Sequence, residues 1–279
     1  MQNICPLSVA LRASVNALVA HRTHMIQAPK RSFNDALCPY KCRMDYHPTN
    51  LPTKPRGVAR VDDRRVLNGL FRILRSGAAW RDLPATYGPY KTCYNRFVRW
   101  QRAGVWSGIL DAISNEKNAD VQMIDSSIVR VHQHGSCIKR DEAHCTGRSR
   151  GGLTTKIHAV VDGRGLPVQL ALSPGQEHDS LIAVELLSNL QSQGLLLADK
   201  AYDSDAIRKF VQDSGAWEII PPRSNRKNPI CFSPHLYRDR NHVERFFKRI
   251  ERCRGIATRY EKLVENFPAF IKLAAIRLC

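Results

Sequence analysis

The sequence has no run of 18 or more apolar residues, no Cys-x-x-Cys pair and comparatively few acidic side chains. Without a long apolar run, a membrane-spanning protein is excluded, and we expect no membrane partner. The nine cysteines are scattered from Cys5 to Cys279 without zinc-site or disulfide-framework spacing, so reduced thiols in a cytoplasm fit best. Only 25 Asp and Glu stand against 43 Lys and Arg, a net charge of +18 on 279 residues. This excess predicts a polyanionic partner, most often nucleic acid, although a merely basic surface is the alternative.

Acidic residues are scarcest at the start of the chain, where none occurs before Asp35. Three prolines between residues 48 and 55 then indicate a loop. We therefore predict an atypical, poorly ordered N-terminal extension over residues 1–57, with an organelle transit peptide as the alternative reading of this acid-poor segment.

Apolar residues recur at helical spacing over residues 61–77, 91–102 and 105–113. Three short helices, the second of them basic, predict a helix-turn-helix-like DNA-binding domain over residues 58–118. Arg96, Arg99 and Arg102 lie on the second helix and are candidates for reading base edges. A solvated charged face, in a three-helix packing used for another purpose, is the alternative.

After Asp120 the pattern changes from helical to alternating, which indicates strands. We expect strands at residues 121–131, 156–161, 168–172, 195–199 and 218–220, with a hairpin after the second and helices before and after the fourth. A further helix over residues 238–252 and an apolar one over 263–278 complete the chain. Residues 119–279 are therefore predicted to form a mixed α/β domain.

Two carboxylates occupy unusual positions in the predicted strands. Asp125 lies within the first strand, and Asp199 follows three leucines at the carboxyl end of a later one. A carboxylate there is costly to desolvate unless it is paired or binds a metal, and open α/β sheets place their sites at strand ends. The alternative is that each caps the turn that follows it.

A third acid, Glu244, lies on the expected basic helix. Tyr237, Arg240 and Glu244 are spaced i, i+3, i+7 and so share one helix face. An ordinary ion pair with Lys248 is the alternative role for Glu244.

The chain from residue 61 to 278 resembles the DDE transposases of bacterial insertion sequences, in the group typified by insertion sequence five. The resemblance rests on six strings, found here in the family's order: VDDRRVLNGLFRILRSGAAWRDLP, YGPYKTCYNRFVRWQRAGVW, MIDSSIVRVHQH, KIHAVVDGRGLPVQLALSPGQEHD, LLADKAYDSD and YRDRNHVERFFKRIERCRGIATRYEK. It implies a ribonuclease-H-like mixed sheet flanked by helices, preceded by a small helical domain.

The resemblance also implies an activity and its residues. The family's catalytic and metal-binding acids fall on Asp125, Asp199 and Glu244, and its Tyr-Arg-Glu signature falls on Tyr237, Arg240 and Glu244. Carboxylate oxygens suit Mg²⁺, with Mn²⁺ as a substitute, and two such ions support phosphodiester cleavage and strand transfer. We expect Asp125 to bridge the ions, Arg240 to orient Glu244 or touch a phosphate, and Tyr237 to contact a DNA end.

The implied partner is double-stranded DNA, both the inverted repeats at the element ends and the target. We expect a homodimer in the DNA complex, in a bacterial cytoplasm and associated with the nucleoid. The stretch from Arg223 to Lys262 carries 12 Lys or Arg against four acids, which is typical of a phosphate-tracking surface.

One position departs from the family pattern. Seven residues after the glutamate the family usually has a lysine that grips the terminal phosphate, whereas this chain has Glu251. A carboxylate repels phosphate, and Lys248, Arg249 or Arg252 would have to substitute. Two alternatives stay open: a degenerate, non-catalytic DNA-binding copy, and a structure-specific nuclease of the same fold.

Overall fold

A computed structural model describes residues 62–115, 120–136, 145–227, 230–263 and 265–278. The expected N-terminal extension, residues 1–57, lies outside the described residues. The described residues all belong to one compact unit. Among the described helices, none is both long and apolar enough to cross a membrane.

The centre of this unit is a seven-stranded sheet, counted over the described residues, in which β1 (Val121–Val131) is the middle strand. Beside it, β3 (Gly152–Asp162) pairs antiparallel with β1, and β4 (Pro167–Pro174) pairs antiparallel with β3. On the other side, β5 (Leu195–Leu197) pairs parallel with β1, and β6 (Trp217–Ile219) pairs parallel with β5. The order β4-β3-β1-β5-β6, with three antiparallel strands followed by two parallel ones, confirms the expected ribonuclease-H-like fold.

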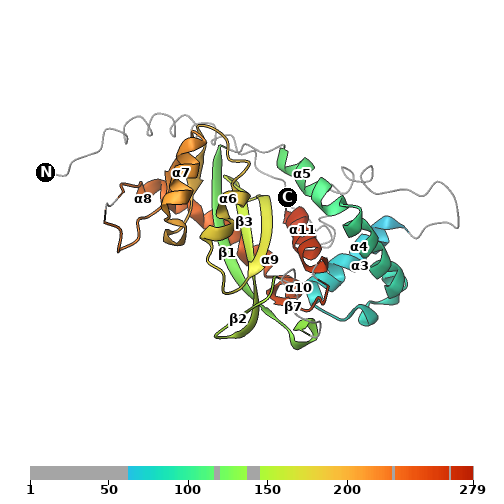
Figure 1. The fold of residues 1–279 in the computed structure, drawn as a ribbon. Helices are drawn as coiled ribbons and strands as arrows, with labels where there is room; N and C mark the ends of the chain where they lie inside the picture. The colour runs from blue at the N-terminus through green and yellow to red at the C-terminus, as the bar shows by residue number, and fades with distance from the viewer. Residues whose placement is uncertain (1–61, 116–119, 137–144, 228–229, 264, 279) are drawn as a thin grey trace. The chain divides into compact units, whose positions relative to one another are not determined.

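Two short strands extend the sheet near its lower end in Figure 1. They are β2 (Gly147–Ser149), which pairs antiparallel with β3, and β7 (Thr258–Arg259), which pairs parallel with the end of β1. Because β7 lies next to Val131, it brings the C-terminal part of the chain back to the middle strand.

The β3–β4 hairpin forms where the turn chemistry predicts it. Oδ1 of Asp162 accepts hydrogen bonds from the backbone N–H groups of Arg164 and Leu166, 3.0 and 2.8 Å away. Gly165 has a φ of 77°, in the left-handed region that a residue without a Cβ adopts freely. Asp162 is therefore a turn residue and takes no part in the candidate site.

Helices cover both faces of the sheet. On one face α9 (Asn241–Ile250) packs on β1 and β3. On the other face Ile124 and Val160 pack into an apolar core with α6 (Ser180–Leu186) and α7 (Asp205–Asp213). Side chains alternate along a strand, so Asp125 and Ser127 of β1 face α9, whereas Ile124 and Ser126 face α6.

The first three described helices also have the predicted positions: α3 (Asp63–Ser76), α4 (Tyr90–Arg102) and α5 (Val105–Asn115). In α3 the Asp62 carboxylate accepts a hydrogen bond from the Arg64 N–H, and Gly77 ends the helix with a left-handed residue. Two short 3₁₀ turns, η3 (Trp80–Asp82) and η4 (Ala85–Tyr87), connect α3 to α4.

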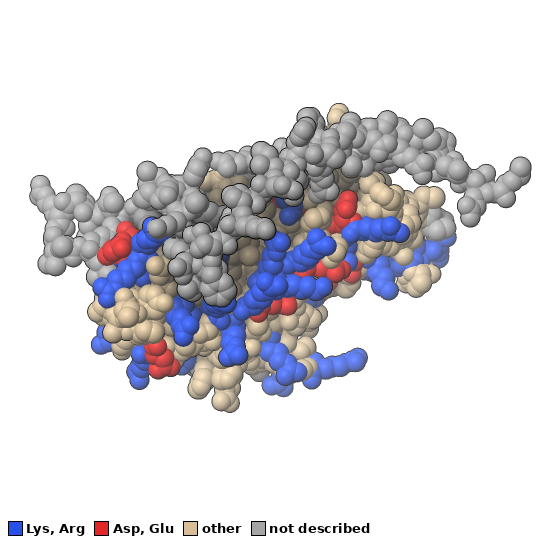
Figure 2. Space-filling model, turned by 180° about the vertical axis from the view of Figure 1, so that it is seen from behind, with Lys and Arg blue, Asp and Glu red and all other residues tan. Residues whose placement is uncertain are grey.

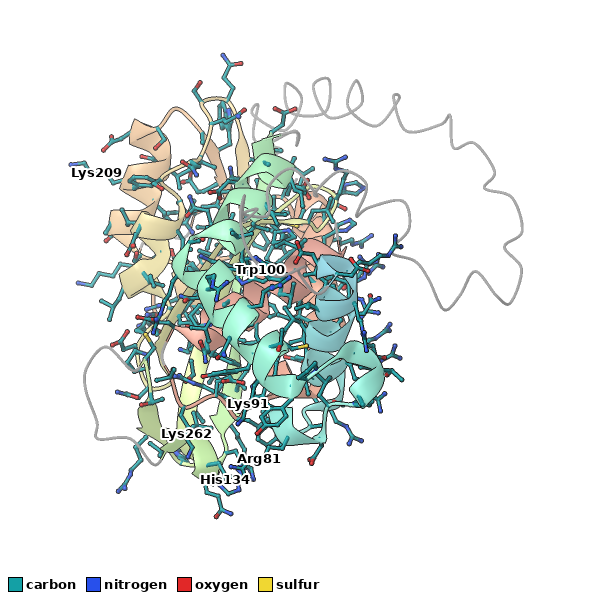
Figure 3. The ribbon with its side chains drawn as sticks, turned by 90° about the vertical axis from the view of Figure 1, so that its right-hand side faces the viewer. Arg81, Lys91, Trp100, His134, Lys209 and Lys262 are labelled. Atoms are coloured by element: carbon teal, nitrogen blue, oxygen red, sulfur yellow. The ribbon has the colours of Figure 1, made fainter. Side chains whose placement is uncertain are left out.

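The last helix, α11 (Asn266–Leu278), lies between the sheet and helices α3–α5 (Figure 1). The Phe270 ring stacks on Phe97 of α4 with centroids 4.6 Å apart, and it stacks on Trp80 at 6.0 Å. Trp100 is 1 % exposed and lies within the same helical layer (Figure 3). The apolar face of α3–α5 is therefore completed by residues from the end of the chain.

One expected helix is interrupted. In place of a single helix over residues 238–252, the chain forms α8 (Pro234–Tyr237), a 3₁₀ turn η8 (Arg238–Arg240) and then α9. The backbone keeps right-handed helical angles from Tyr237 through Arg240 into α9. Side chains at i, i+3 and i+7 therefore still share one face, although the hydrogen-bond pattern changes from α to 3₁₀ and back. A four-residue α10 (Arg254–Ala257) follows before β7.

Candidate active site

Asp125 and Asp199 lie side by side in the register of two parallel strands. Met123 of β1 is paired with Leu197, the last residue of β5; Asp125 comes two residues after Met123 within β1, and Asp199 comes two residues after Leu197, just past the end of β5. Asp199 therefore stands where a parallel strand ends, as sites of open α/β sheets do, and Asp125 lies on the neighbouring strand.

Glu244 reaches the same place from α9 through a shared arginine. Nη2 of Arg240 donates a hydrogen bond to Oδ2 of Asp125, and Nη1 donates one to Oε1 of Glu244, each 2.9 Å long. The Arg240 guanidinium also lies 5.8 Å from the centre of the Tyr237 ring. The i, i+3, i+7 set thus converges on the aspartate of the middle strand.

Electrostatic coupling links all three acids. Burial raises the pKa of Asp125 to about 6; Arg240 and the Ser126 N–H oppose this rise, while Asp199 and Glu244 add to it. Burial also raises the pKa of Tyr237, against Arg240 and with contributions from Asp199, Asp125 and Glu244. The pKa of Arg240 rises despite the opposing effect of its burial, because the same carboxylates favour its charged form. The three acids form one electrostatic site around Arg240 and Tyr237.

The chemistry of this donor set fits a divalent metal ion, but the side chains do not form a ready-made cage. Three carboxylates supply the hard oxygen ligands that Mg²⁺ prefers. Within the described ranges, however, no three His, Cys, Asp or Glu side chains are placed to hold an ion together. Arg240 takes the cationic position between Asp125 and Glu244 instead.

Asp199 also has the structural role considered as its alternative. Its Oδ1 accepts a 2.8 Å hydrogen bond from the Ala201 N–H and caps the 3₁₀ turn η7 (Lys200–Tyr202). This bond uses one of its two oxygens and fixes the carboxylate at the strand end. Capping and ligand binding are therefore compatible for this residue.

Behind Asp125, on the α6 face, lies a polar cluster that sequence reasoning missed. Lys156 of β3 is almost buried and pairs with Oδ1 of Asp179 at 2.8 Å, and the same oxygen accepts a 3.0 Å hydrogen bond from the Ser126 hydroxyl. Lys156 also donates to the backbone oxygen of Glu177 at 2.6 Å. Asp179 directly precedes α6, but its side chain makes no capping bond. A lysine in an otherwise apolar strand was the available signal for this cluster.

Asp203 also lies just before a helix, α7, but its side chain is engaged elsewhere. The cap of α7 is Ser204, whose hydroxyl accepts a hydrogen bond from the Ile207 N–H. Asp203 is buried and accepts hydrogen bonds from the side chains of Arg208 and Arg226. It therefore anchors the segment after η7, which begins four residues beyond Asp199.

The basic residues proposed to contact DNA differ in their exposure to solvent. Arg99 and Arg102 of α4 are exposed, as are Lys248 of α9 and Arg252 just after it. Arg96 is mostly buried, pairs with Asp63 of α3 and lies 5.6 Å from the centre of the Trp100 ring. Arg96 thus helps to join α3 to α4.

The basic stretch between Arg223 and Lys262 is largely on the surface. Its exposed cations are Lys227, Arg238, Arg245, Lys248, Arg249, Arg252, Arg254 and Lys262. In Figure 2 Lys and Arg side chains spread over much of the visible face, with fewer acidic ones among them. Arg81, His134 and Lys262 project at one end of the molecule in Figure 3, where β7 joins β1.

Comparison with known proteins assigns the chain to a family. Residues 116–229 and residues 196–279 each match a family model described as "Transposase DDE domain". Residues 46–110 match a model described as "Putative transposase of IS4/5 family". These matches follow the order of the strings on which the resemblance rests.

Two curated relatives and one solved structure are similar to the chain. The "Putative transposase for insertion sequence element IS6501" of Brucella ovis is 39% identical over 123 residues, 44% of this chain and 95% of the relative. The "Uncharacterized protein y4sN" of Sinorhizobium fredii is 37% identical over 101 residues, 36% of this chain and 81% of the relative. A piggyBac transposase synaptic complex with hairpin DNA aligns at 13% identity with a TM-score of 0.38, over 63% of this chain and 46% of that one. The chain belongs to the DDE transposases of bacterial insertion sequences.

Proposed function

We propose that this chain binds the terminal inverted repeats of an insertion sequence, cuts the DNA at those ends and joins the freed 3′-hydroxyl to target DNA. The observation that carries the proposal is that Arg240 hydrogen-bonds both Asp125 and Glu244, while Asp199 follows the strand that pairs with β1. These three acids come from β1, the segment just after β5 and α9, and this arrangement supports a common metal site.

In the proposed mechanism Asp125, Asp199 and Glu244 would hold the divalent ions. Bound there, such ions would supply activation of the attacking oxygen and charge neutralisation at the leaving oxygen of an in-line displacement. Above its pKa of about 6, Asp125 is ionised and acts as an anionic ligand. The Asp199 carboxylate is held in place by the Ala201 N–H, so little ordering is needed on binding.

The remaining residues position the DNA. Arg240 offers a planar pair of N–H donors, which suits a phosphate, and the adjacent Tyr237 ring supports it from one side. Exposed cations such as Lys248 and Arg252 supply salt-dependent affinity for the backbone without reading sequence. Arg99 and Arg102 on α4 are the candidates for base contacts, and two copies of the chain would bring two element ends together.

Cleavage of a labelled duplex tests this function. The duplex carries the inverted repeat that flanks the gene, and cutting is measured with Mg²⁺ or Mn²⁺ and with a chelator. Asp199→Asn should abolish cutting while duplex binding persists, whereas Asp239→Asn, an exposed acid just before α9, should cut like the parent chain. Undiminished cutting by Asp199→Asn would refute the catalytic assignment.

Glu251 favours one other function, that of a transposase copy that binds the element ends without cutting them. The Glu251 side chain is exposed near the β1 face that carries Asp125. In the same assay this reading predicts specific duplex binding and no cleavage with either ion.

A further inference from the structure

The positively charged guanidinium of Arg240 lies between two carboxylates, in a position where a metal ion could otherwise bind. Its two terminal nitrogens each donate to a different acid, Asp125 and Glu244, at equal 2.9 Å distances. The side chain is 15% exposed, and its buried Nε has no hydrogen-bond partner among the described residues. The guanidinium is therefore held mainly by the acids that it bridges and by the Tyr237 ring.

The two acids differ in their exposure to solvent. The Asp125 side chain is 17% exposed, whereas the Glu244 side chain is 43% exposed. A mostly buried carboxylate is costly to leave without a positively charged partner, and Arg240 supplies that partner to Asp125.

We propose that Arg240 is a built-in counter-cation that occupies the acidic site until a DNA phosphate binds it in place of the carboxylates, so that DNA and the divalent ion bind cooperatively. The proposal rests on the function proposed above for Asp125, Asp199 and Glu244. It adds a competition: Arg240 already uses one oxygen of each of two carboxylates that are proposed to hold the ion, Oδ2 of Asp125 and Oε1 of Glu244.

A DNA phosphate relieves this competition because it offers Arg240 another partner. Guanidinium groups bind phosphate and carboxylate with the same paired N–H geometry. When Arg240 binds the phosphate, the carboxylate oxygens that it had occupied become available, and the divalent ion replaces the lost positive charge. By linkage, a bound ion must equally strengthen DNA binding. The chain would then hold its ions firmly only on DNA, which limits random cutting.

Mn²⁺ binding, measured by calorimetry on the full chain, tests the proposal without relying on activity. The parent chain should bind Mn²⁺ about tenfold more tightly in the presence of the inverted-repeat duplex than in its absence. Arg240→Gln should bind Mn²⁺ about tenfold more tightly than the parent without DNA, and the duplex should add little. Lys209→Gln removes one exposed charge from α7, outside the basic stretch, and should behave like the parent.

Arg240→Lys separates charge from geometry, because lysine keeps the charge but cannot donate to both acids from a planar fork. It should give an intermediate Mn²⁺ affinity without DNA, and circular dichroism checks that each variant is folded. Equal DNA-free affinities of the parent and Arg240→Gln would overturn the proposal, as would a parent affinity that the duplex leaves unchanged. Absence of Mn²⁺ binding in every chain, with or without DNA, would instead overturn the proposed function, and this proposal with it.

Discussion

The hydroxyl of Ser127 donates a 2.8 Å hydrogen bond to Oε1 of Glu251, the residue that stands where related transposases usually have lysine. Ser127 comes two residues after Asp125 on the same face of β1, so Glu251 borders the candidate site. The structure thus gives the departure from the family pattern a definite place and a partner.

Glu251→Lys should strengthen binding to the inverted-repeat duplex, because it replaces a repelling carboxylate with an ammonium group near the phosphate path. Each new phosphate contact steepens the plot of log affinity against log salt by about 0.9. Fluorescence anisotropy over a range of salt concentrations measures both effects. Glu251→Gln, which removes the charge without adding a cation, should raise affinity without the steeper salt slope; identical slopes for parent and Glu251→Lys would contradict the prediction.

Asp179→Asn should destabilise the fold, because it leaves the nearly buried ammonium of Lys156 without its carboxylate partner. Breaking a buried ion pair from one side costs about 3 kcal/mol, which urea unfolding would register as a lower midpoint. Glu177→Gln is the matched control, since Lys156 contacts only the backbone oxygen of Glu177. If both variants unfold at the parent midpoint, the pair contributes nothing to stability.

Asp203→Asn should remove a pH-dependent part of the stability. Burial tends to raise the pKa of Asp203, but hydrogen bonds from Arg226, the Arg223 N–H and Arg208 outweigh it and lower the pKa to about 2. Since an unfolded aspartate titrates near 3.9, this contribution is complete above about pH 4 and is lost as the pH falls toward 2.

The shift of nearly two pKa units corresponds to roughly 2.5 kcal/mol at pH 7. The parent chain should therefore have a higher free energy of unfolding than Asp203→Asn at pH 7, and this difference should be smaller at pH 3. Two other acids contact the same arginines: Asp205 pairs with Arg226, and Glu218 lies 3.5 Å from Arg208. Asp205→Asn, at a 90% exposed position, is the control and should change stability little at either pH.

Asp125→Asn should stabilise the metal-free chain at pH 8. The folded pKa of Asp125, about 6, lies above its unfolded value, so the folded state retains the proton longer and loses stability as the pH rises from about 4 through 6. Removing the charge should recover up to about 3 kcal/mol at pH 8 and almost nothing at pH 4. Thermal unfolding in chelator at both pH values checks this, with Asp239→Asn as the control; a lower melting temperature at pH 8 would contradict it.

Much of the fold could be predicted because its local patterns agree with its tertiary structure. The alternation over residues 121–131 and the Asp162 turn predict β1 and the β3–β4 hairpin, both of which are confirmed. The pairing of β1 with β5 could not be read from either strand, because it depends on parallel contacts across a long connection. That pairing is what brings Asp125 and Asp199 together.

Side-chain partners were harder to predict than strands. The spacing of Tyr237, Arg240 and Glu244 indicates a shared face but does not reveal that Arg240 reaches Asp125, 115 residues earlier in the chain. Asp179 and Asp203 stand just before helices, as caps do, and only tertiary packing shows that buried cations occupy them instead. Local sequence signals cannot distinguish these two uses of an aspartate.

The packing of α11 against α3–α5 has a consequence for biosynthesis. The rings of Phe97 and Trp80 emerge from the ribosome long before Phe270, which covers them. Until α11 is made, the growing chain exposes these aromatic rings, and a premature stop before residue 266 leaves them uncovered. A nascent chain therefore presents an apolar surface on α3–α5, and protection by chaperones should matter most in the interval before translation reaches the last helix.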